Sequence, residues 1–457
     1  MNPVDAEIDA RKTTADAGLA FVNYFRCPPE LAPFEVVNSS SLREGFFRCG
    51  PATCFGRTEA LACAETPEAA RLDALFAVEL SSEGDVRLPF SPTEVIENLR
   101  RERYLTTSSR EHLLHTLYYL VRPILPFPAR KLLQRYVSHR RRAAKFPSWP
   151  IDCSVEEICE SLMALAIQVA PTQEVPFIWF WPEGKHAAVM VTHDVEQRSG
   201  VYLCDMLMDM DEALGIKASF QIVPEGRYGG VEDLIGKIRS RGFEVNVHDL
   251  DHNGTLYQDR KLFEKRAQKI NEYARLYGMR GFRAGAMHRN QNWFGLLDFQ
   301  YEMSVPTVSH LEPQRGGCCT VMPYFVGGLL ELPLTTIQDH SLFYILGEHS
   351  IDLWKQQIGI ISSHHGLVSF IVHPDYLAKK KERSVYRELL KYLSQQRHHQ
   401  NMWMAFPGEI NDWWRKRKNM TLRQEKGTWR IAGEGSESAR IAYASVANGR
   451  LEYRIVN

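Results

Sequence analysis

The chain has 457 residues, which favours two or three domains, and its 44% hydrophobic and 24% charged residues are typical of a globular protein. Lysine and arginine total 55, as do aspartate and glutamate, so the charge balance gives no sign of a nucleic-acid or acidic-membrane partner. The nine cysteines are irregularly spaced and include no C-x-x-C pair. This usage favours buried thiols in a reducing compartment over a disulfide framework.

The N-terminal stretch, MNPVDAEIDARKTTADAG, lacks the basic start and apolar core of a signal peptide. No apolar run reaches the roughly 18 residues that a membrane-spanning helix needs. We therefore expect a cytoplasmic protein with no membrane span.

Residues 1–145 mix short apolar runs with turn-rich stretches, and they carry no chemistry that assigns them a role. A helical pattern covers roughly 111–142, but three prolines interrupt it and must break or kink the helix. We interpret 146–184 as a linker, FPSWPID, followed by a helix over 155–169 that leads into the next domain.

From residue 175 onward, short apolar runs alternate with amphipathic stretches. The amphipathic stretches predict helices over 203–214, 232–241 and 261–277. Continuous apolar strands separated by helices are typical of a parallel sheet covered on both faces, or of a closed barrel. The number of such units over about 230 residues favours an α/β barrel.

We place this barrel at 185–415. The remaining residues, 416–457, change to short alternating patterns that predict a small C-terminal β segment. Within it, Asn448 and Gly449 form a typical hairpin turn before the strand RLEYRIV.

Polar residues gather where the predicted barrel strands end. An isolated pair of histidines four residues apart is more often two ordinary polar residues than two ligands. Barrel enzymes, however, assemble their sites at the carboxyl ends of the strands, and four strands that all end in polar residues favour a real site over chance. The residues concerned are His193, Asp194, Glu196, His248, His252, Arg283, His373 and Asp375.

Two neutral imidazoles and one carboxylate leave an open position on a divalent metal ion. We therefore predict one divalent ion held by His248, His252 and Glu196, and imidazole ligands favour zinc. Asp194 lies two residues before Glu196, so it points to the same side of the strand and can act as the general base.

Two interpretations stay open for each of the other two residues. Arg283 either pairs with Asp194 and keeps it ionised, or only bridges a surface carboxylate. His373 either protonates a leaving amine, or only ends a strand. The whole set taken together favours the catalytic interpretation.

The motifs THDVE, HDLDH, FRAG, YEMSVP and FIVHPDYL occur in an order and spacing that resembles the polysaccharide deacetylase family, the carbohydrate esterase family 4-like enzymes with a NodB-homology domain. The resemblance covers roughly 185–410, about half of the chain. It implies a distorted (β/α)7-type barrel and metal-dependent hydrolysis of N-acetyl groups on sugars. It also implies roles residue by residue: base for Asp194, metal ligands for Glu196, His248 and His252, orientation of the base for Arg283, and general acid for His373.

The chain departs from the family pattern at three positions. Glu196 replaces the usual aspartate, Asp249 replaces a serine or threonine, and Ala286 stands where proline or another apolar residue is usual. These departures bear on the substrate more than on the metal. The family also contains members that act on non-sugar amides, so hydrolysis of a C–N bond is a safer expectation than a named polysaccharide.

We therefore expect a metal-dependent amide hydrolase that removes N-acetyl groups from a sugar or polysaccharide precursor. One alternative is an amidohydrolase acting on a non-sugar amide, and another is a carbohydrate-binding barrel without catalysis. The expected partner is a carbohydrate or small amide substrate, with no nucleic acid. The sequence does not give the oligomeric state.

Overall fold

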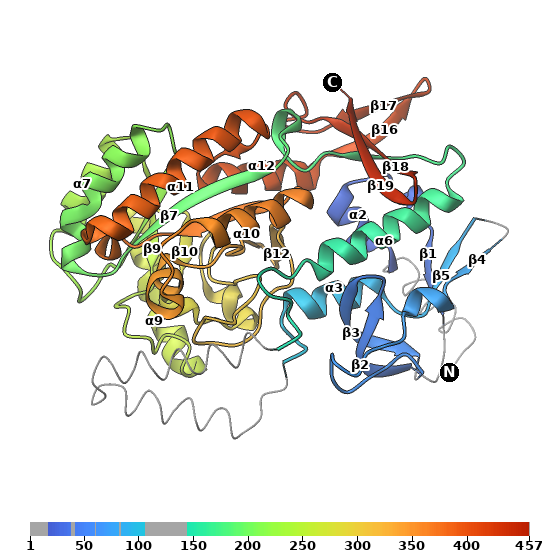
Figure 1. Ribbon diagram of the computed structural model, residues 1–457, viewed down its shortest axis with the longest axis horizontal. Helices are drawn as coiled ribbons and strands as arrows, with labels where there is room; N and C mark the ends of the chain where they lie inside the picture. Colours follow the sequence, from blue (N-terminus) through green and yellow to red (C-terminus); the bar gives the residue numbers. More distant parts are fainter. Residues whose placement is uncertain (1–16, 38–41, 60, 82–83, 106–143, 457) are drawn as a thin grey trace. The chain divides into compact units, whose positions relative to one another are not determined.

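The computed structural model describes residues 17–37, 42–59, 61–81, 84–105 and 144–456. The helical pattern expected over 111–142 lies outside the described residues. Contacts divide the chain into two compact units (Figure 1). The barrel unit comprises Leu105–Asp152 and His186–Asn411, and the companion unit comprises Met1–Tyr104, Cys153–Lys185 and Asp412–Asn457.

The barrel unit is built on a sheet of seven parallel strands among the described residues, in the order β13-β11-β10-β9-β8-β7-β14. Their apolar runs are buried because helices cover the outside of the sheet. Two short strands extend it: β12 is antiparallel to β13, and β15 is parallel to β7. The strand bounds are β7 (Ala188–Val195), β8 (Ala218–Ile222), β9 (Glu244–His248), β10 (Gly281–Arg283), β11 (Tyr301–Glu302), β12 (Tyr324–Val326), β13 (Leu329–Glu331), β14 (Leu367–Ile371) and β15 (Trp403–Met404).

The segment that follows β13 closes the sheet onto β14 through side chains. Ser369 Oγ donates to the Pro333 carbonyl at 2.6 Å, and Thr335 Oγ1 donates to the Leu367 carbonyl at 2.7 Å. The Thr336 N–H donates to the Ser369 carbonyl at 3.3 Å. Hydroxyl groups thus replace much of the regular backbone hydrogen bonding between these two segments, so the barrel is distorted here. The predicted distorted (β/α)7-type barrel is confirmed.

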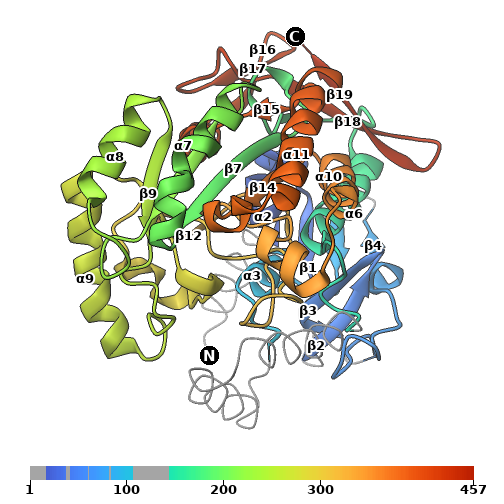
Figure 2. The same ribbon diagram turned by 60° about the vertical axis from the view of Figure 1, so that its left-hand side comes forward.

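Helices α7 to α11 lie outside this sheet (Figure 2). The predicted helices at 203–214, 232–241 and 261–277 are confirmed as α7, α8 and α9, with ends shifted by a few residues. The helix bounds are α7 (Arg198–Glu212), α8 (Val231–Ser240), α9 (Arg260–Tyr277), α10 (Asp352–Ser363) and α11 (Lys380–His399). Short helical turns are η4 (Gly285–Met287), η5 (Gln291–Leu296), η6 (Ser341–Leu346) and η7 (Pro374–Ala378).

Helix α9 shows why these segments fold as they do. The Asp259 side chain accepts a hydrogen bond from the Leu262 N–H at 2.9 Å and so caps the first turn. Gly278, with φ of 59°, ends the helix in the left-handed conformation that glycine tolerates. Its buried face consists of Phe263, Ala267, Ile270 and Ala274.

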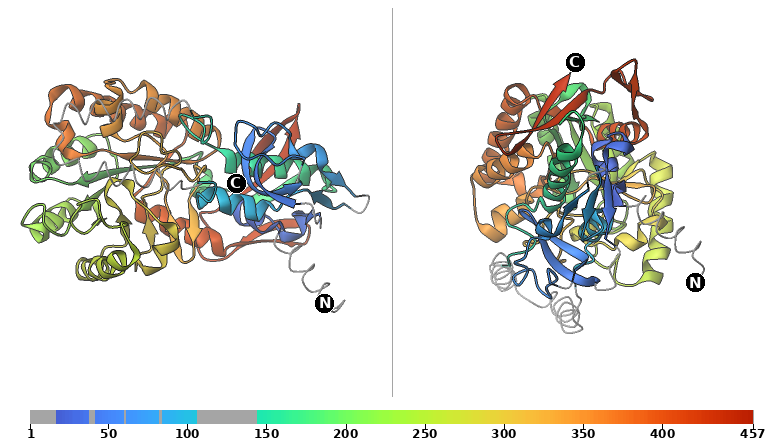
Figure 3. Two further views of the ribbon diagram at one scale, coloured as in Figure 1. Left: turned by 90° about the horizontal axis from the view of Figure 1, so that it is seen from below. Right: turned by 90° about the vertical axis from the view of Figure 1, so that its right-hand side faces the viewer.

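The companion unit combines the N-terminal strands, helix α6 and the C-terminal strands (Figure 3). Its helices are α2 (Leu19–Phe25), α3 (Pro92–Arg100) and α6 (Ser154–Val169), with turns η1 (Pro29–Leu31), η2 (Ala74–Ala77) and η3 (Pro182–Gly184). Its strands are β1 (Phe34–Val36), β2 (Leu42–Cys49), β3 (Ala52–Glu59), β4 (Glu79–Leu80), β5 (Val86–Leu88), β6 (Val175–Ile178), β16 (Thr421–Glu425), β17 (Thr428–Ala432), β18 (Ile441–Ala447) and β19 (Arg450–Val456). Helix α12 (Pro407–Asn419) begins in the barrel unit and ends in this one.

Strand β6 comes from the apolar run VPFIWFW, which precedes the residues expected to form the barrel. It pairs antiparallel with β18 and does not join the barrel sheet. The predicted C-terminal hairpin is confirmed: β18 and β19 are joined by Asn448 and Gly449, whose φ angles are 52° and 74°. The domain roles inferred from the sequence stay predictions.

Two further features concern the whole described chain. None of the nine cysteines, all of which are described residues, forms a disulfide, and every one except Cys63 is buried. Among the described helices, none combines the length and the hydropathy that crossing a membrane requires.

Candidate metal and catalytic site

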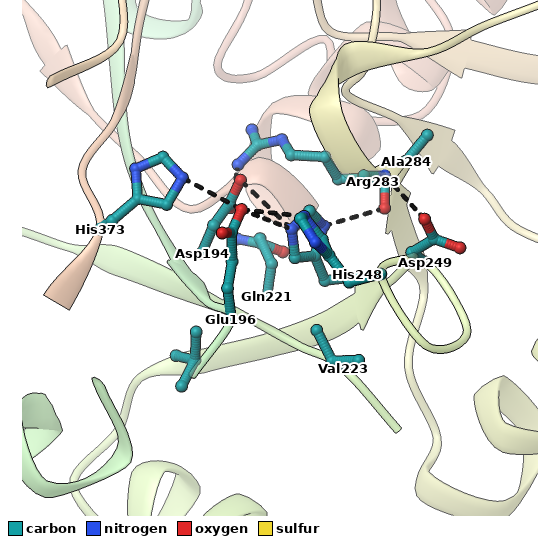
Figure 4. A network of polar contacts seen from close by, with 12 residues as sticks. Asp194, Glu196, Gln221, Val223, His248, Asp249, Arg283, Ala284 and His373 are labelled. Atoms are coloured by element: carbon teal, nitrogen blue, oxygen red, sulfur yellow. Dashed lines mark hydrogen bonds and ion pairs between the residues drawn. The ribbon is translucent and has the colours of Figure 1, made fainter. Parts of the chain in front are cut away.

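The residues given catalytic or metal-binding roles from the sequence lie together at the carboxyl ends of four barrel strands. Figure 4 shows five of them: Asp194, Glu196, His248, Arg283 and His373. Strand β7 contributes Asp194 and leads into Glu196, which follows the strand by one residue. The register of β9 and β10 pairs His248 with Arg283. His373 follows β14 by two residues, at the same edge of the sheet.

Three of these residues form a group that suits a divalent metal ion. The possible ligand atoms of Glu196, His248 and His252 all lie within 4.8 Å of one another. His252 Nε2 is 2.9 Å and His248 Nε2 is 3.6 Å from Glu196 Oε1. Neither Nε2 atom makes a hydrogen bond within the described chain, although both are buried.

A metal ion fits this arrangement. His248 Nδ1 donates to the Arg283 carbonyl at 3.1 Å, which leaves the lone pair of Nε2 facing Glu196. Buried imidazole nitrogens that make no hydrogen bond carry a desolvation cost that a metal ion would remove. Two imidazoles and a carboxylate are a donor set that zinc accepts.

The loop that carries His252 is held in an unusual conformation. Asp249 and His252 both have positive φ angles, 55° and 51°, which few residues other than glycine adopt. The Asp249 carboxylate accepts hydrogen bonds from the Leu250 N–H at 2.7 Å and the Gly285 N–H at 3.2 Å. A Cβ on Gly285 would lie 2.5 Å from Asp249 Oδ2, so only glycine fits beside this loop.

The remaining charged pair on β7 and β10 is a buried ion pair. Arg283 Nη1 donates to Asp194 Oδ1 and to Thr192 Oγ1, each at 2.7 Å, and Arg283 Nε donates to the Met303 carbonyl at 3.1 Å. Burial opposes the ionisation of Asp194, but the nearby charges of Arg283, His248 and His373 outweigh it, so the pKa of Asp194 is lowered. Asp194 is therefore ionised at neutral pH.

His373 is oriented by a carboxylate that the sequence analysis missed. His373 Nδ1 lies 2.7 Å from Asp339 Oδ1, and the His373 N–H donates to Asp339 Oδ2, also at 2.7 Å. Asp339 is fully buried. The only signal in the sequence is a carboxylate four residues after the apolar run LLELPLT at 329–335, and nothing there indicates that it meets His373.

The other ring nitrogen of His373 faces the metal-site carboxylate. His373 Nε2 lies 3.3 Å from Glu196 Oε1. Burial lowers the pKa of His373, but Asp339 and Glu196 outweigh that effect, so the pKa lies well above its ordinary value. Figure 4 shows Asp194 and Glu196 between His373 on one side and His248 on the other.

No protein-family model matches the chain, and no curated protein matches it. Solved structures do match. A protein from Mycobacterium smegmatis assigned as a polysaccharide deacetylase is 19% identical, covering 55% of this chain and 97% of that one, with a TM-score of 0.43. Puue allantoinase is 13% identical, covering 51% and 92%, with a TM-score of 0.41. Peptidoglycan deacetylase PdaC from Bacillus subtilis is 10% identical, covering 50% and 90%, with a TM-score of 0.33.

Polysaccharide deacetylases, whose motifs the sequence resembles, are thus among the solved structures to which this chain is similar. Identities this low concern the fold and not the substrate. The chemistry of this chain follows instead from the geometry of its own residues.

Proposed function

We propose that this protein is a metal-dependent hydrolase of C–N amide bonds that removes an N-acetyl group from a sugar or a polysaccharide precursor. One observation carries the proposal. Two buried imidazole nitrogens without hydrogen-bond partners converge on Glu196, and an ionised carboxylate and an oriented histidine lie beside that group.

Glu196, His248 and His252 would hold one divalent ion, and the donor set favours zinc. When bound, the ion supplies a Lewis acid that polarises the substrate carbonyl and makes a nearby water more acidic. His248 is already oriented for this role by its hydrogen bond to the Arg283 carbonyl.

Asp194 is proposed as the general base. Its Oδ1 is engaged by Arg283 at 2.7 Å, while Oδ2 lies 3.8 Å from His248 Nε2 and so faces the metal group. Because the pKa of Asp194 is lowered, the carboxylate is available to accept a proton from the attacking water. Arg283 is proposed to hold Asp194 in this ionised state and orientation.

His373 is proposed as the general acid. An amine anion is a poor leaving group, so amide hydrolysis needs a proton at nitrogen as the bond breaks. Asp339 fixes His373 through Nδ1 and leaves Nε2 as the proton donor. Asp194 and His373 come from different strands, and this allows them to act on the water and on the leaving nitrogen respectively.

The experiment is an assay of acetate release by the zinc-loaded protein on N-acetylated sugars, with non-sugar acetamides assayed in parallel. Asp194→Asn and His373→Ala serve as matched inactive controls, and each should lower the rate by about 10² to 10⁴-fold with the metal retained. Acetate release from the non-sugar acetamides alone would show that the substrate is a non-sugar amide. No release from either class by metal-loaded protein would overturn the proposed function.

A further inference from the structure

His193 is fully buried beside the catalytic base, yet the proposed mechanism gives it no role. Side chains alternate along a strand, so Asp194 points into the barrel and His193 points outward. On that outer side, its ring lies 4.8 Å from the Phe220 ring and 5.9 Å from the Tyr386 ring.

Both ring nitrogens of His193 face oxygen atoms from other elements. Nδ1 lies 3.0 Å from the Val372 carbonyl oxygen, and Nε2 lies 2.9 Å from Asp211 Oδ2. Tyr386 Oη donates to the other oxygen of Asp211 at 2.6 Å. Asp211 belongs to α7 and Tyr386 to α11, the two helices that flank β7 (Figure 2).

Val372 lies between the end of strand β14 and His373. The paired register of β7 and β14 ends at Thr192 and Ile371, before either catalytic residue is reached. Beyond it, the Val372 N–H donates to the Thr192 carbonyl at 2.9 Å, and the His193 imidazole contacts the Val372 carbonyl. His193 thus links the strand end that carries Asp194 to the residue directly before His373.

A fully buried histidine–aspartate pair adds little net stability compared with apolar groups of the same shape, because both polar groups lose their hydration. The pair instead restricts the position of the His193 ring. Asp211 and Tyr386 fix the imidazole from the helix side, and the imidazole in turn fixes the Val372 carbonyl.

We propose that His193 is a positioning residue, which together with Asp211 and Tyr386 sets the separation between Asp194 and His373. The proposal rests on the proposed function, since it assigns these two residues as base and acid. It predicts that losing the contact to the Val372 carbonyl lowers kcat without removing the metal or changing KM.

Two triple variants test this, and they differ at one residue only. The first is His193→Phe with Asp211→Leu and Tyr386→Phe, which removes all three polar partners at once and so leaves no unpaired side chain in the cluster. The second has His193→Asn with the same two other changes. The asparagine amide can occupy the position of Nδ1 and keep a donor to the Val372 carbonyl.

The phenylalanine variant should lose about 10- to 100-fold in kcat, with KM and zinc content within about twofold of the parent. The asparagine variant should stay within about threefold of the parent in kcat. Equal kcat values for the two variants would overturn the proposal. So would a phenylalanine variant that does not fold, judged by its thermal melt, because His193 would then serve stability and not position.

His365 offers a matched control at the opposite ends of the same two strands. It directly precedes Gly366 and β14, and its Nδ1 lies 3.3 Å from the carbonyl of His186, which precedes β7. His365→Asn should change stability and leave kcat unaltered. A parent protein with no hydrolase activity would refute the proposed function itself. An active parent with a fully active phenylalanine variant would refute only the positioning role.

Discussion

Asp339 binds both the ring and the backbone of His373, with each carboxylate oxygen 2.7 Å from one nitrogen. This arrangement fixes the rotation of the imidazole, and it keeps a proton on Nδ1, the ring nitrogen that faces Asp339. His373 Nε2 is thereby directed toward Glu196, 3.3 Å away.

We predict that Asp339→Ala lowers kcat by about 10²-fold, because His373 loses the group that orients it. Zinc content should not change, since Asp339 lies outside the metal group. Asp375→Asn is the matched control: this carboxylate is two residues from His373 but accepts its hydrogen bond from Ser199. A normal kcat in the Asp339→Ala variant would show that His373 does not depend on Asp339.

Glu196 is the proposed ligand that departs from the family pattern. Two replacements distinguish the effect of its negative charge from the effect of its side-chain length. Glu196→Gln should weaken zinc binding by at least about tenfold, because a neutral amide is a poorer ligand than a carboxylate. Glu196→Asp should retain part of the affinity. Zinc titration of the stripped proteins measures both. Parent-like affinity in both variants would move the third ligand to another carboxylate, such as Asp194.

Gly285 lies against the loop that follows His248 and carries His252. In Gly285→Ala, the new Cβ would lie 2.5 Å from Asp249 Oδ2 and 3.0 Å from His252 Cδ2, so the loop must move. We expect zinc affinity to fall by about tenfold or more. Gly229→Ala is the control, since its Cβ would meet no atom within 4 Å. Equal zinc affinity in the two variants would contradict a role for Gly285 in shaping the site.

The sequence predicted that the candidate site residues gather at one edge of the sheet, because the signal for this is local. Asp194, Glu196, His248 and His373 each follow an apolar run, and parallel strands bring such ends to one edge of a sheet. Asp339 was not predicted, because its contact with His373 depends on the path of the segment after β13. The same holds for barrel closure through Thr335 and the Ser369 side chain, which no local pattern encodes.

Strand β6 shows a second limit of sequence patterns. Its apolar run is of the same kind as those of the barrel strands, so local composition cannot say which sheet it joins. Pairing with β18 brings together segments more than 250 residues apart, and that choice is made by tertiary packing.

His365 should make the protein sensitive to acid. Burial, with nearby His186 adding to it, lowers the pKa of His365 to about 3, whereas the ordinary value is 6.5. Below pH 6.5 the unfolded chain therefore binds a proton that the folded protein excludes, so stability is lost as the pH falls from 6.5 toward 3. This residue should lower the free energy of unfolding by up to about 1.4 kcal/mol per pH unit.

The His365→Asn variant tests this contribution. His365 has a positive φ of 56°, and asparagine tolerates this conformation. Urea unfolding at about pH 7 and about pH 5 should show the variant losing less stability than the parent, by up to about 2 kcal/mol. Parallel losses in the two proteins would show that His365 is protonated in the folded state.

Glu196, His248 and His252 are proposed to form a metal site, and the other proposed roles depend on it. Its most direct test is the metal content of the purified parent and of His252→Ala, measured by mass spectrometry after zinc loading and removal of free metal. We predict about one zinc ion per parent chain, and loss of that ion from a variant that still melts cooperatively, because His252 lies in a loop over the strand ends. Full zinc occupancy in His252→Ala would contradict the site.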